Sequence, residues 1–452
     1  MPKKIVRKLA KSISDIGGNV YFVGGYVRDE YLNRDNKDID IEVYGISPEQ
    51  LKCICQEFGN VDEIGASFGI LKIKGIDIDI AMPRTEKKTG NRHTDFSVSF
   101  DPYMSTKEAS KRRDFTINAL MKHVLSGEII DHYGGLNDLN NKIIRHINDE
   151  TFIEDPLRVY RAAGFASRLD FEIAPETMDL CKQINTSLVA KERVYEETNK
   201  VLLKSIKPSI YFNMLREMNQ LKRFPDLERL IDIPQNPTWH PEGDTWNHTM
   251  EVIDKAALVR DQTSFPLGFM YAALLHDIGK ADATTKGLDG QIHSLDHETI
   301  GAQQVPEALS KLTTDMKLKS YVQNLVENHM TPHFMTRKTS EKTTNRYLDR
   351  CIAPKDSIIL SYIDTSKVNR EELALSEDGW WDNRLAVYDK IKKEPEVTGR
   401  DLIKLGYKPG PMFKKIIEKC HQIHLAGVSK EDVIKQLPGI VKGIHQHEEN
   451  AR

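Results

Sequence analysis

One short region combines glycines, an arginine and aspartates in an order that suits phosphate and metal chemistry. Gly24 and Gly25 follow the apolar run NVYFV and precede Arg28. Two glycines at a strand-to-helix turn let backbone N–H groups approach a phosphate, and an arginine in the first helical turn can bind it. Asp38 and Asp40 follow in a strand-like run, whose two-residue period places both carboxylates on one face. Such a pair can hold two Mg²⁺ ions about 3.5 to 4 Å apart, as phosphoryl transfer requires.

A further carboxylate can complete this site. Asp77 and Asp79 repeat the same-face pattern in the run IDIDIA. An isolated acid-x-acid pattern is more often the solvent-facing side of an amphipathic strand. A glycine pair followed by an acid pair on the next strand resembles the active-site plan of the DNA polymerase β-like nucleotidyltransferase superfamily. This resemblance implies nucleotide transfer and a third carboxylate on a nearby strand. We expect Asp79 to be that carboxylate, and to assist metal binding or to deprotonate an attacking hydroxyl.

The second group with chemical potential is a set of histidines and aspartates in the C-terminal half. Imidazoles and carboxylates on helices suit a divalent transition metal or Mg²⁺, and a bound metal can generate hydroxide near neutral pH. A lone histidine on an apolar helix would more often be structural, but here one His-Asp pair is followed by Ile-Gly-Lys. The candidates are His248, His276, Asp277, His297, His329 and Asp364.

The elements that must position these residues can be read from apolar periodicity. An amphipathic helix begins the chain, and residues 19 to 82 alternate short β-rich runs with turns and one helix, which predicts an α/β sheet. The polar stretch 83 to 102 predicts a loop, much of it mobile. A helix is expected over 105 to 123, opened by a capping box of Ser105 and Glu108.

At 452 residues the chain is too long for one hydrophobic core. The pattern is helical from about 141 to 225, and three prolines with a glycine between 231 and 248 mark a boundary. We predict a head (1–140), a helical neck (141–225), a helical body (240–375) and a helical tail (376–452). The expected fold class is α+β, with a mixed sheet and helices in the head and only helices after it.

Composition limits the partners. The net charge of -3 excludes overall basicity as the basis of RNA binding, so contacts must come from local clusters such as Lys111, Arg112 and Arg113. The five cysteines are scattered, which argues against a disulfide framework or a zinc site. No window approaches the roughly 18 apolar residues of a membrane span. We expect no membrane association, a cytoplasmic location, and a monomer or homodimer.

From about residue 20 to 225 the chain resembles the bacterial class II CCA-adding enzymes and poly(A) polymerases. The matching segments are VGGYVRDEYL, KDIDIEV, the RTEKKTG loop, KRRDFTINAL, GEIIDHYGGLNDL, EDPLRVYRAAGFA and KERVYEE. The resemblance implies a DNA polymerase β-like nucleotidyltransferase head. It also implies Mg²⁺-dependent addition of CCA to the 3′ end of tRNA from CTP and ATP, without a nucleic-acid template.

The same resemblance implies roles for single residues. Gly25 and Arg28 would bind the nucleotide phosphates, and the pair Asp38 and Asp40 would hold the metals. Arg113 would contact the incoming nucleotide. Asn118, expected on the same helix as Arg113, would face the sugar.

The segment EDPLR matches the part of the family that replaces a nucleic-acid template. Glu154, Asp155 and Arg158 occupy it, and Asp155 and Arg158 would bond the Watson–Crick edges of CTP and ATP. A carboxylate accepts from the exocyclic amino group that cytosine and adenine share, and a guanidinium donates to ring nitrogen and carbonyl. Guanine and uracil present the opposite pattern, and unpaired buried polar groups reject a substrate by roughly 10⁴ to 10⁵. The same residues also suit an ordinary helix start, with Pro156 in the first turn.

Two further positions refine this expectation. Arg161, one turn beyond Arg158, would add a phosphate or base contact, whereas Gly164 stands where many relatives carry another arginine. The loop from Arg84 to Asp95 favours full CCA addition, because CC-adding relatives tend to lack it. Poly(A) polymerases share nearly every motif and remain the alternative.

The C-terminal cluster resembles the HD phosphohydrolase superfamily. The resemblance implies that His248, His276, Asp277 and Asp364 hold a divalent metal, and that His297 and His329 match second-metal positions. Lys280 would steady a phosphate leaving group or pair near Asp277. HD domains fused to CCA-adding enzymes are associated with 2′,3′-cyclic phosphodiesterase, 2′-nucleotidase and phosphatase activity. Hydrolysis by this domain as the main function is a second alternative. The tail would touch tRNA phosphates or simply pack on the HD domain.

Overall fold

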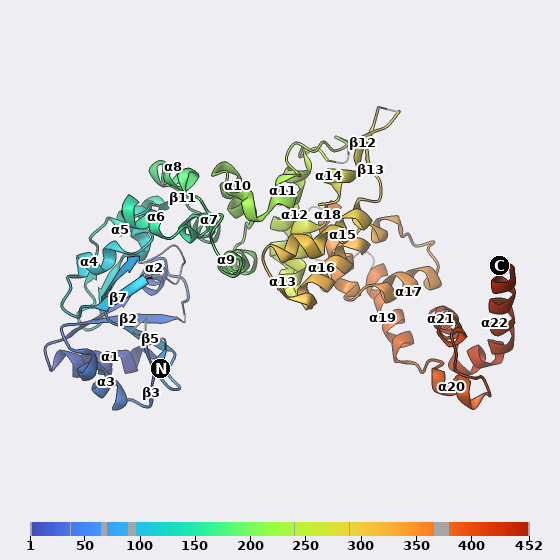
Figure 1. The fold of residues 1–452 in the computed structure, drawn as a ribbon, viewed down its shortest axis with the longest axis horizontal. Coiled ribbons are helices and arrows are strands. Elements are labelled where there is room, and N and C mark those ends of the chain that lie inside the picture. The colour runs from blue at the N-terminus through green and yellow to red at the C-terminus, as the bar shows by residue number, and fades with distance from the viewer. Residues whose placement is uncertain are drawn as a thin grey trace. The chain divides into compact units, whose positions relative to one another are not determined.

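The computed structural model describes residues 2–36, 38–64, 70–88, 96–238, 240–288, 290–365 and 379–450 (Figure 1). The chain forms two compact units, Met1–Arg223 and Phe224–Arg452. The finer division into head, neck, body and tail stays a prediction. Among the described residues, no helix has the length and apolar character needed to cross a membrane.

A seven-stranded mixed sheet forms the centre of the first unit. Its strand order is β3-β4-β5-β2-β1-β8-β9. The β2 and β5 strands run parallel and pair Asp40 with Asp79, while the other neighbours in the sheet are antiparallel. This sheet confirms the predicted α+β class. The strands are β1 (Asn19–Val23), β2 (Ile39–Tyr44), β3 (Val61–Ile64), β4 (Ile70–Ile73), β5 (Ile78–Ala81), β8 (Met121–His123) and β9 (Ile129–Ile130).

Three helices at the start of the chain pack on this sheet or lead from it. The expected N-terminal helix α1 (Pro2–Ser14) buries Val6, Leu9 and Ile13 at helical spacing. The α2 helix (Gly25–Tyr31) follows β1 directly. The α3 helix (Pro48–Gln56) begins with a capping box between Ser47 and Gln50. These elements place the glycine pair and the acid pair at neighbouring strand ends.

The stretch predicted as a loop over 83 to 102 contains a β-hairpin instead. The β6 strand (Arg84–Lys88) pairs antiparallel with β7 (Phe96–Phe100) in a separate two-stranded sheet. Residues 89 to 95 lie outside the described residues. The prediction was wrong for the two strands because ladder bonds join backbone groups, so the polar side chains of RTEKK do not prevent pairing.

The helix predicted over 105 to 123 is also wrong beyond its first two turns. The α4 helix (Thr106–Lys111) is capped by Ser105 and ends before Arg112. The chain then extends at Phe115, makes a 3₁₀ turn η1 (Thr116–Asn118) and enters β8. The Asp114 carboxylate accepts from the backbone N–H of Phe115 at 2.9 Å, a local bond that competes with helix formation. Arg113 and Asn118 therefore do not share a helix.

The rest of the first unit is helical, apart from a short parallel pair of two-residue strands, β10 (Ile143–Ile144) and β11 (Glu172–Ile173). The α7 and α9 helices lie side by side and parallel, since Asp155 bonds Arg193 near their first turns and Ser167 bonds Ser205 near their last. The helices are α5 (Gly135–Asn141), α6 (Asp149–Glu154), α7 (Leu157–Leu169), α8 (Pro175–Gln183), α9 (Lys191–Lys204) and α10 (Ser209–Glu217), with the 3₁₀ turn η2 (Leu221–Arg223).

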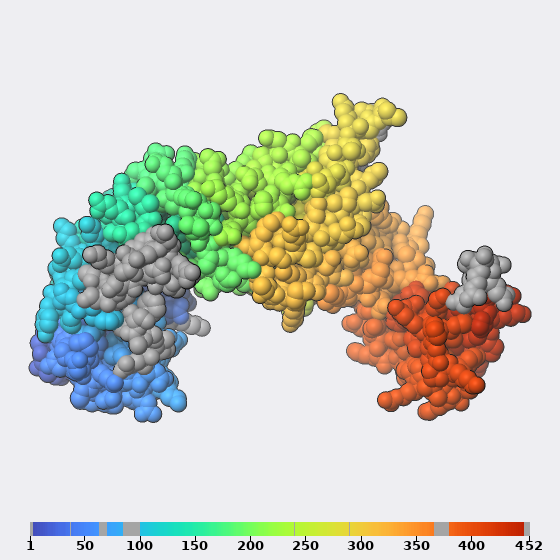
Figure 2. Space-filling view, in the orientation of Figure 1, coloured from blue at the N-terminus to red at the C-terminus, as the bar shows by residue number. Residues whose placement is uncertain are grey.

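In the described part of the second unit, the regular elements are helices and one pair of antiparallel strands, β12 (Thr284–Lys286) and β13 (Ile292–Ser294), which protrudes from the unit (Figures 1 and 2). Its first group of helices is α11 (Pro225–Glu228), α12 (Thr245–Val259), α13 (Pro266–Leu275), α14 (Lys280–Ala283), α15 (His297–Ser310), α16 (Met316–Asn328), α17 (Glu341–Arg350) and α18 (Pro354–Thr365), with 3₁₀ turns η3 (Arg260–Gln262) and η4 (Thr331–Phe334). The last helices are α19 (Trp380–Lys393), α20 (Gly399–Lys404), α21 (Met412–His424) and α22 (Lys430–Asn450).

Candidate active sites

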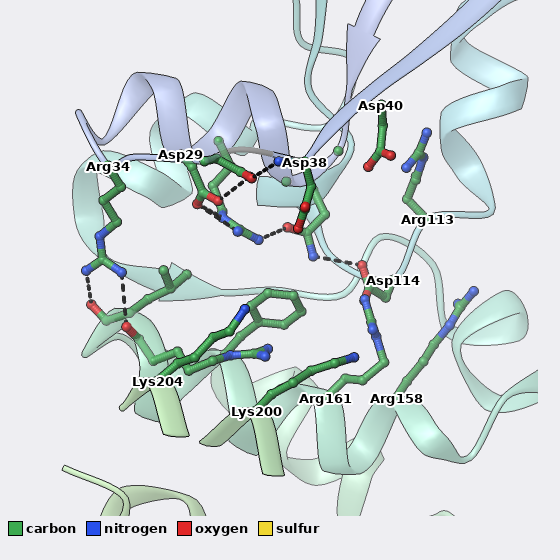
Figure 3. Close-up of a pocket in the computed structure, with 18 of the residues that line it drawn as sticks. Asp29, Arg34, Asp38, Asp40, Arg113, Asp114, Arg158, Arg161, Lys200 and Lys204 are labelled. Carbon is green, nitrogen blue, oxygen red and sulfur yellow. Dashed lines mark hydrogen bonds and ion pairs between the residues drawn. The ribbon is translucent and has the colours of Figure 1, made fainter. Parts of the chain in front are cut away.

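A cavity of about 730 Å³ in the first unit collects most of the residues predicted for nucleotide transfer (Figure 3). Asp79 is not among its lining residues, but it lines an adjoining cavity of about 230 Å³ that also reaches Asp40 and Arg113. Glu154 is exposed and lines neither cavity. The predicted residues in the larger cavity are Gly25, Arg28, Asp38, Asp40, Arg113, Asn118, Asp155, Arg158 and Arg161.

The carboxylates gather where β2 and β5 begin. Asp38 immediately precedes β2 and is exposed, whereas Asp40 lies within the strand and is half-buried. Asp79 on β5 is the register partner of Asp40 and bonds Lys72 Nζ at 2.7 Å. Burial, followed by the negative charge of Asp79, raises the pKa of the Asp40 carboxyl. A hard divalent cation fits this group, because oxygen ligands of like charge need a positive partner.

The turn between β1 and α2 forms one corner of the cavity. Gly24 has φ +66°, and a Cβ at this position would lie 3.0 Å from Arg113 Nη1. Arg28 donates from Nε to Asp29 at 2.7 Å and from Nη1 to Asn118 Oδ1 at 2.7 Å. Asn118 thus reaches the cavity through its bond to Arg28, although it is not on the predicted helix.

Two residues expected to read the base lie at the first turn of α7, each held by other groups. The Asp155 carboxylate accepts from Arg193 Nη1 at 3.1 Å and Nη2 at 2.9 Å. Arg158 donates to the backbone carbonyls of Thr151 at 2.9 Å and Arg112 at 2.6 Å. Asp155 Oδ1 also accepts from the backbone N–H of Leu157 at 3.2 Å, so the unused lone pair lies on Oδ2. The Arg158 guanidinium has further N–H groups. The pair is therefore oriented in advance while capacity for a ligand remains.

Asp114 is a buried member of the site that sequence reasoning missed. Its Oδ2 accepts from Arg161 Nε at 2.7 Å, and its Oδ1 accepts from Asn118 Nδ2 at 2.9 Å. Burial opposes its negative charge, but Arg161, Asn118 and Arg158 outweigh burial and hold its pKa below the usual range. Asp114 engages Nε and one side of Nη2 of Arg161, and Nη1 donates to Glu197 Oε1 at 3.4 Å. A ligand contact from Arg161 is left to the remaining N–H groups of Nη1 and Nη2.

Other cavity residues escaped prediction because each comes from a different turn of α7 or α9. These side chains are Arg168 on α7 and Arg193, Lys200 and Lys204 on α9. Their spacing along the two helices was the available signal. The sequence does not say which faces of two helices meet, so the signal could not be used.

The second unit brings all six predicted histidines and aspartates into one buried cluster. The first group, His248, His276 and Asp364, has ligand atoms within 4.8 Å of one another. Asp364 Oδ1 lies 2.7 Å from His248 Nε2 and 3.4 Å from His276 Nε2. These residues come from α12, the end of α13 and α18.

The second group is Asp277, His297 and His329, which meets the same 4.8 Å limit. Asp277 Oδ1 lies 3.2 Å from His297 Nε2 and 4.0 Å from His329 Nε2. Among the described residues, the buried His329 Nε2 has no hydrogen-bond partner. Burial lowers the pKa of His329 to about 3, with the nearby His276 and His297 contributing, so this imidazole is neutral.

The ring orientation of these histidines suits metal ligation. The Nδ1 atoms of His276, His297 and His329 each bond the backbone carbonyl three residues earlier, at 2.9, 2.7 and 2.6 Å. That bond fixes the proton on Nδ1 and leaves the Nε2 lone pair facing the cluster. Among the described residues, the buried Nε2 atoms of His297 and His329 both lack a hydrogen-bond partner. With these two nitrogens and two groups of three ligands, the cluster fits one or two divalent cations.

Three further side chains contact this cluster. Glu242 and His333 were not predicted to do so, and Lys280 was predicted either to steady a phosphate or to pair near Asp277. Glu242 lies 2.6 Å from His248 Nδ1 and 3.0 Å from His240 Nδ1. Lys280 Nζ lies 2.7 Å from Asp277, which is the pairing given above as one alternative. His333, in η4, lies 3.4 Å from Asp364 Oδ2.

Three family models match the chain. A poly A polymerase head domain matches residues 20–145, a probable RNA and SrmB-binding site of polymerase A matches 170–231, and an HD domain matches 245–365. Asp38, Asp40 and Asp79 lie within the first match, and the six histidines and aspartates of the second cluster lie within the HD match. Asp155 and Arg158 lie between the first two matches.

Comparison with whole proteins gives relatives of similar length. A multifunctional CCA protein of Mannheimia succiniciproducens is 38% identical over 330 residues, covering 71% of this chain and 75% of the relative. One from Cupriavidus necator is 34% identical over 345 residues, covering 74% and 80%. In fold, the chain is similar to the Bacillus stearothermophilus CCA-adding enzyme in complex with CTP (TM-score 0.68, 21% identity, 99% of each chain). It is also similar to the Thermotoga maritima enzyme complexed with tRNA (TM-score 0.63, 20% identity, 98% and 95%). The chain belongs to the family of bacterial CCA-adding enzymes that carry an HD domain.

Proposed function

We propose that this protein adds CCA to the 3′ end of tRNA from CTP and ATP, and that the first unit performs the transfer. The observation that carries the proposal is a single cavity whose lining includes both the pair Asp38 and Asp40 and the pair Asp155 and Arg158. One set of groups serves phosphoryl transfer and the other serves base selection. The relatives named multifunctional CCA proteins, and the similar folds in complex with CTP, ATP and tRNA, support the same activity.

In the proposed reaction, Mg²⁺ held by Asp38 and Asp40 would neutralise negative charge on the triphosphate. Arg28 and the backbone at Gly25 bind the phosphates and set the α-phosphorus in line with the primer. The 3′-hydroxyl of the tRNA attacks the α-phosphorus, its proton passes to Asp79, and pyrophosphate leaves.

Base selection in this proposal uses the two side chains at the start of α7. Asp155 accepts from the amino group of cytosine or adenine, and Arg158 donates to the ring. Their bonds to Arg193 and to the carbonyls of Thr151 and Arg112 hold them in place before a nucleotide enters. Uracil and guanine would leave these polar groups unpaired, which is the basis of their rejection.

For the second unit we propose hydrolysis of phosphate esters at RNA ends. His248, His276 and Asp364 would hold one divalent cation, with Asp277, His297 and His329 available for a second. The imidazole-rich set favours a transition metal, which would supply a hydroxide nucleophile near neutral pH. We place the protein in the cytoplasm, where its free cysteines suit a reducing compartment.

The test is an extension assay resolved at single nucleotides. The protein and its Asp38→Ala/Asp40→Ala variant are incubated with tRNA that ends at the discriminator base, with Mg²⁺, CTP and ATP. We expect a stop after three added nucleotides that needs both triphosphates and is absent in the variant. Long tails made from ATP alone would indicate a poly(A) polymerase. No extension by the unmodified protein would leave hydrolysis as the function.

A further inference from the structure

The cavity of the first unit carries more positive charge than the proposed reaction has used. Nine of its lining residues are arginines or lysines and six are aspartates, although the whole chain has a net charge of -3. Arg158 is proposed to read the base together with Asp155, and Arg193 bonds Asp155. Arg161 bonds Asp114. Three cations on the neck helices, Arg168, Lys200 and Lys204, have no role in that account.

These three cations lie toward the far end of the cavity from the base-reading pair. The α7 and α9 helices run parallel, with Asp155 and Arg193 at their first turns. Arg168 lies ten residues after Arg158 on α7, which is about 15 Å at 1.5 Å per residue. Lys204 is at the last turn of α9. This span is comparable with an extended nucleoside triphosphate, so a base held at one end would direct its phosphates toward the other.

Arg168 and Arg28 lie against the same aromatic ring, that of Phe165. The Arg168 guanidinium lies 4.6 Å from the centre of the Phe165 ring, and that of Arg28 lies 5.1 Å from the same centre. A Cβ at Gly164 would lie 3.7 Å from Arg168 Nη2, an ordinary contact distance. The carboxylate of Glu197 is 4.0 Å away. The Arg161 guanidinium lies 5.4 Å from the same ring centre, so three guanidiniums meet there. Arg28 is paired with Asp29 and Arg161 with Asp114, and the cationic wall that remains can bind an anion.

Electrostatics at Arg168 agrees with this geometry. Burial lowers the pKa of its guanidinium, and although Glu197 opposes this shift, the positive charges of Arg161 and Arg28 add to it. A bound polyanion would relieve both the burial cost and the repulsion among the cations.

Lys200 and Lys204 extend the same surface by one helical turn. Figure 3 shows both side chains extending from α9 into the cavity, across from Asp38. Lys200 bonds Glu197 at 2.7 Å, whereas Lys204 makes no ion pair within the described part of the chain. Lysines four residues apart on one face repel each other mildly, so their pairing is favourable only with an anion between them.

We propose that Arg168, Lys200 and Lys204 form the neck-side half of the site for the β- and γ-phosphates of the incoming nucleotide, opposite Arg28 of the head. The inference rests on the proposed function and adds the residues that grip the leaving pyrophosphate. Because the neck reads the base and these cations hold the phosphates, one pair of parallel helices measures the whole nucleotide.

The test compares ligands that differ only in their phosphates. The Lys200→Ala/Lys204→Ala variant and the unmodified full-length protein are titrated with CTP, CMP and inorganic pyrophosphate, without RNA. Lys207→Ala is the matched control, since Lys207 is exposed, lies three residues from Lys204 and does not line the cavity. We expect the Kd for CTP and for pyrophosphate to rise about tenfold in the double variant. Binding of CMP should stay unchanged, and Lys207→Ala should match the unmodified protein throughout.

A titration with tRNA distinguishes phosphate binding of the incoming nucleotide from contact of the lysines with RNA phosphates. If the double variant binds CTP and pyrophosphate normally but loses tRNA affinity with a smaller salt dependence, the lysines contact RNA phosphates and the inference is overturned. Equal binding of every ligand by both proteins overturns it as well. If the unmodified protein binds no triphosphate at all, the proposed function itself fails, which is a different result.

Discussion

Replacing Asp114 by asparagine would test whether one buried carboxylate holds α7 against the segment between α4 and β8. The Asp114 side chain is 7% exposed, and its Oδ2 accepts from Arg161 Nε at 2.7 Å and Nη2 at 2.6 Å. Its Oδ1 accepts from Asn118, which in turn accepts from Arg28. An asparagine keeps the shape but has only one acceptor oxygen. Either the Arg161 bonds or the Asn118 bond must be lost.

The expected cost follows from the exposure of the two partners. Removing one member of a fully buried ion pair costs about 3–5 kcal/mol, but the Arg161 side chain is 31% exposed and also has Glu197 nearby. Water therefore screens part of the loss, and we expect about 2–3 kcal/mol. Since the folded pKa of Asp114 lies below the usual value of about 3.9, this stabilisation is present above that pH. It is lost as the pH falls through the folded pKa.

Hydrogen exchange of the α7 amides measures this free energy in the full-length protein, where two units need not unfold in one transition. A double-mutant cycle pairs Asp114→Asn with Arg161→Met. We expect the cost of the double variant to fall short of the summed single costs by about 2 kcal/mol, because both changes break the same pair. A coupling energy near zero would refute the reasoning, and so would an unchanged α7 in Asp114→Asn.

Two predictions concern the second unit. Glu242→Gln should weaken divalent metal binding about 10- to 100-fold, because a neutral amide orients and polarises His248 less well than the carboxylate does. Calorimetric titration of the metal-stripped protein measures this affinity. An unchanged metal affinity in the variant would contradict the prediction. Burial opposes protonation of His421, but the carboxylates of Asp349 and Glu396, each 2.7 Å from one ring nitrogen, outweigh it and raise the His421 pKa. The stabilisation is therefore complete below about pH 6.5 and lost as pH rises through the folded pKa. Thermal unfolding between about pH 6 and 9 should show this loss in the natural protein and not in His421→Gln; parallel pH profiles would contradict it.

Local pattern predicted those elements whose stability is itself local. The runs NVYFV and DIDIEV alternate strongly enough to identify β1 and β2, and the α1 stripe identifies a helix. The segment after α4 was predicted as helix because its residues tolerate one. What decides its shape is Asp114, bonded to Arg161 from 47 positions away in the chain. Likewise, β6 needs β7 as a partner, and composition does not report partners.

The candidate sites divide in the same way. Residues marked by close spacing, such as Asp38 with Asp40 or His276 with Asp277, could be proposed from the sequence, and the structure places each in a cluster. Residues that act through a neighbour were not visible. Arg193 matters because its guanidinium reaches Asp155, 38 positions earlier, once α7 and α9 lie parallel.

In the proposed function, Asp155 and Arg158 at the start of α7 choose the base for the reaction at Asp38 and Asp40. The most direct measurement uses tRNA that lacks its last three nucleotides. This tRNA is incubated with either CTP or UTP, and extension by Asp155→Asn is compared with extension by the unmodified protein. We predict that the unmodified protein prefers CTP by roughly 10⁴. In the variant, the amide can donate to the uracil carbonyl, so this preference should fall to within about tenfold while extension continues. A variant that extends tRNA with the original preference for CTP would contradict the account.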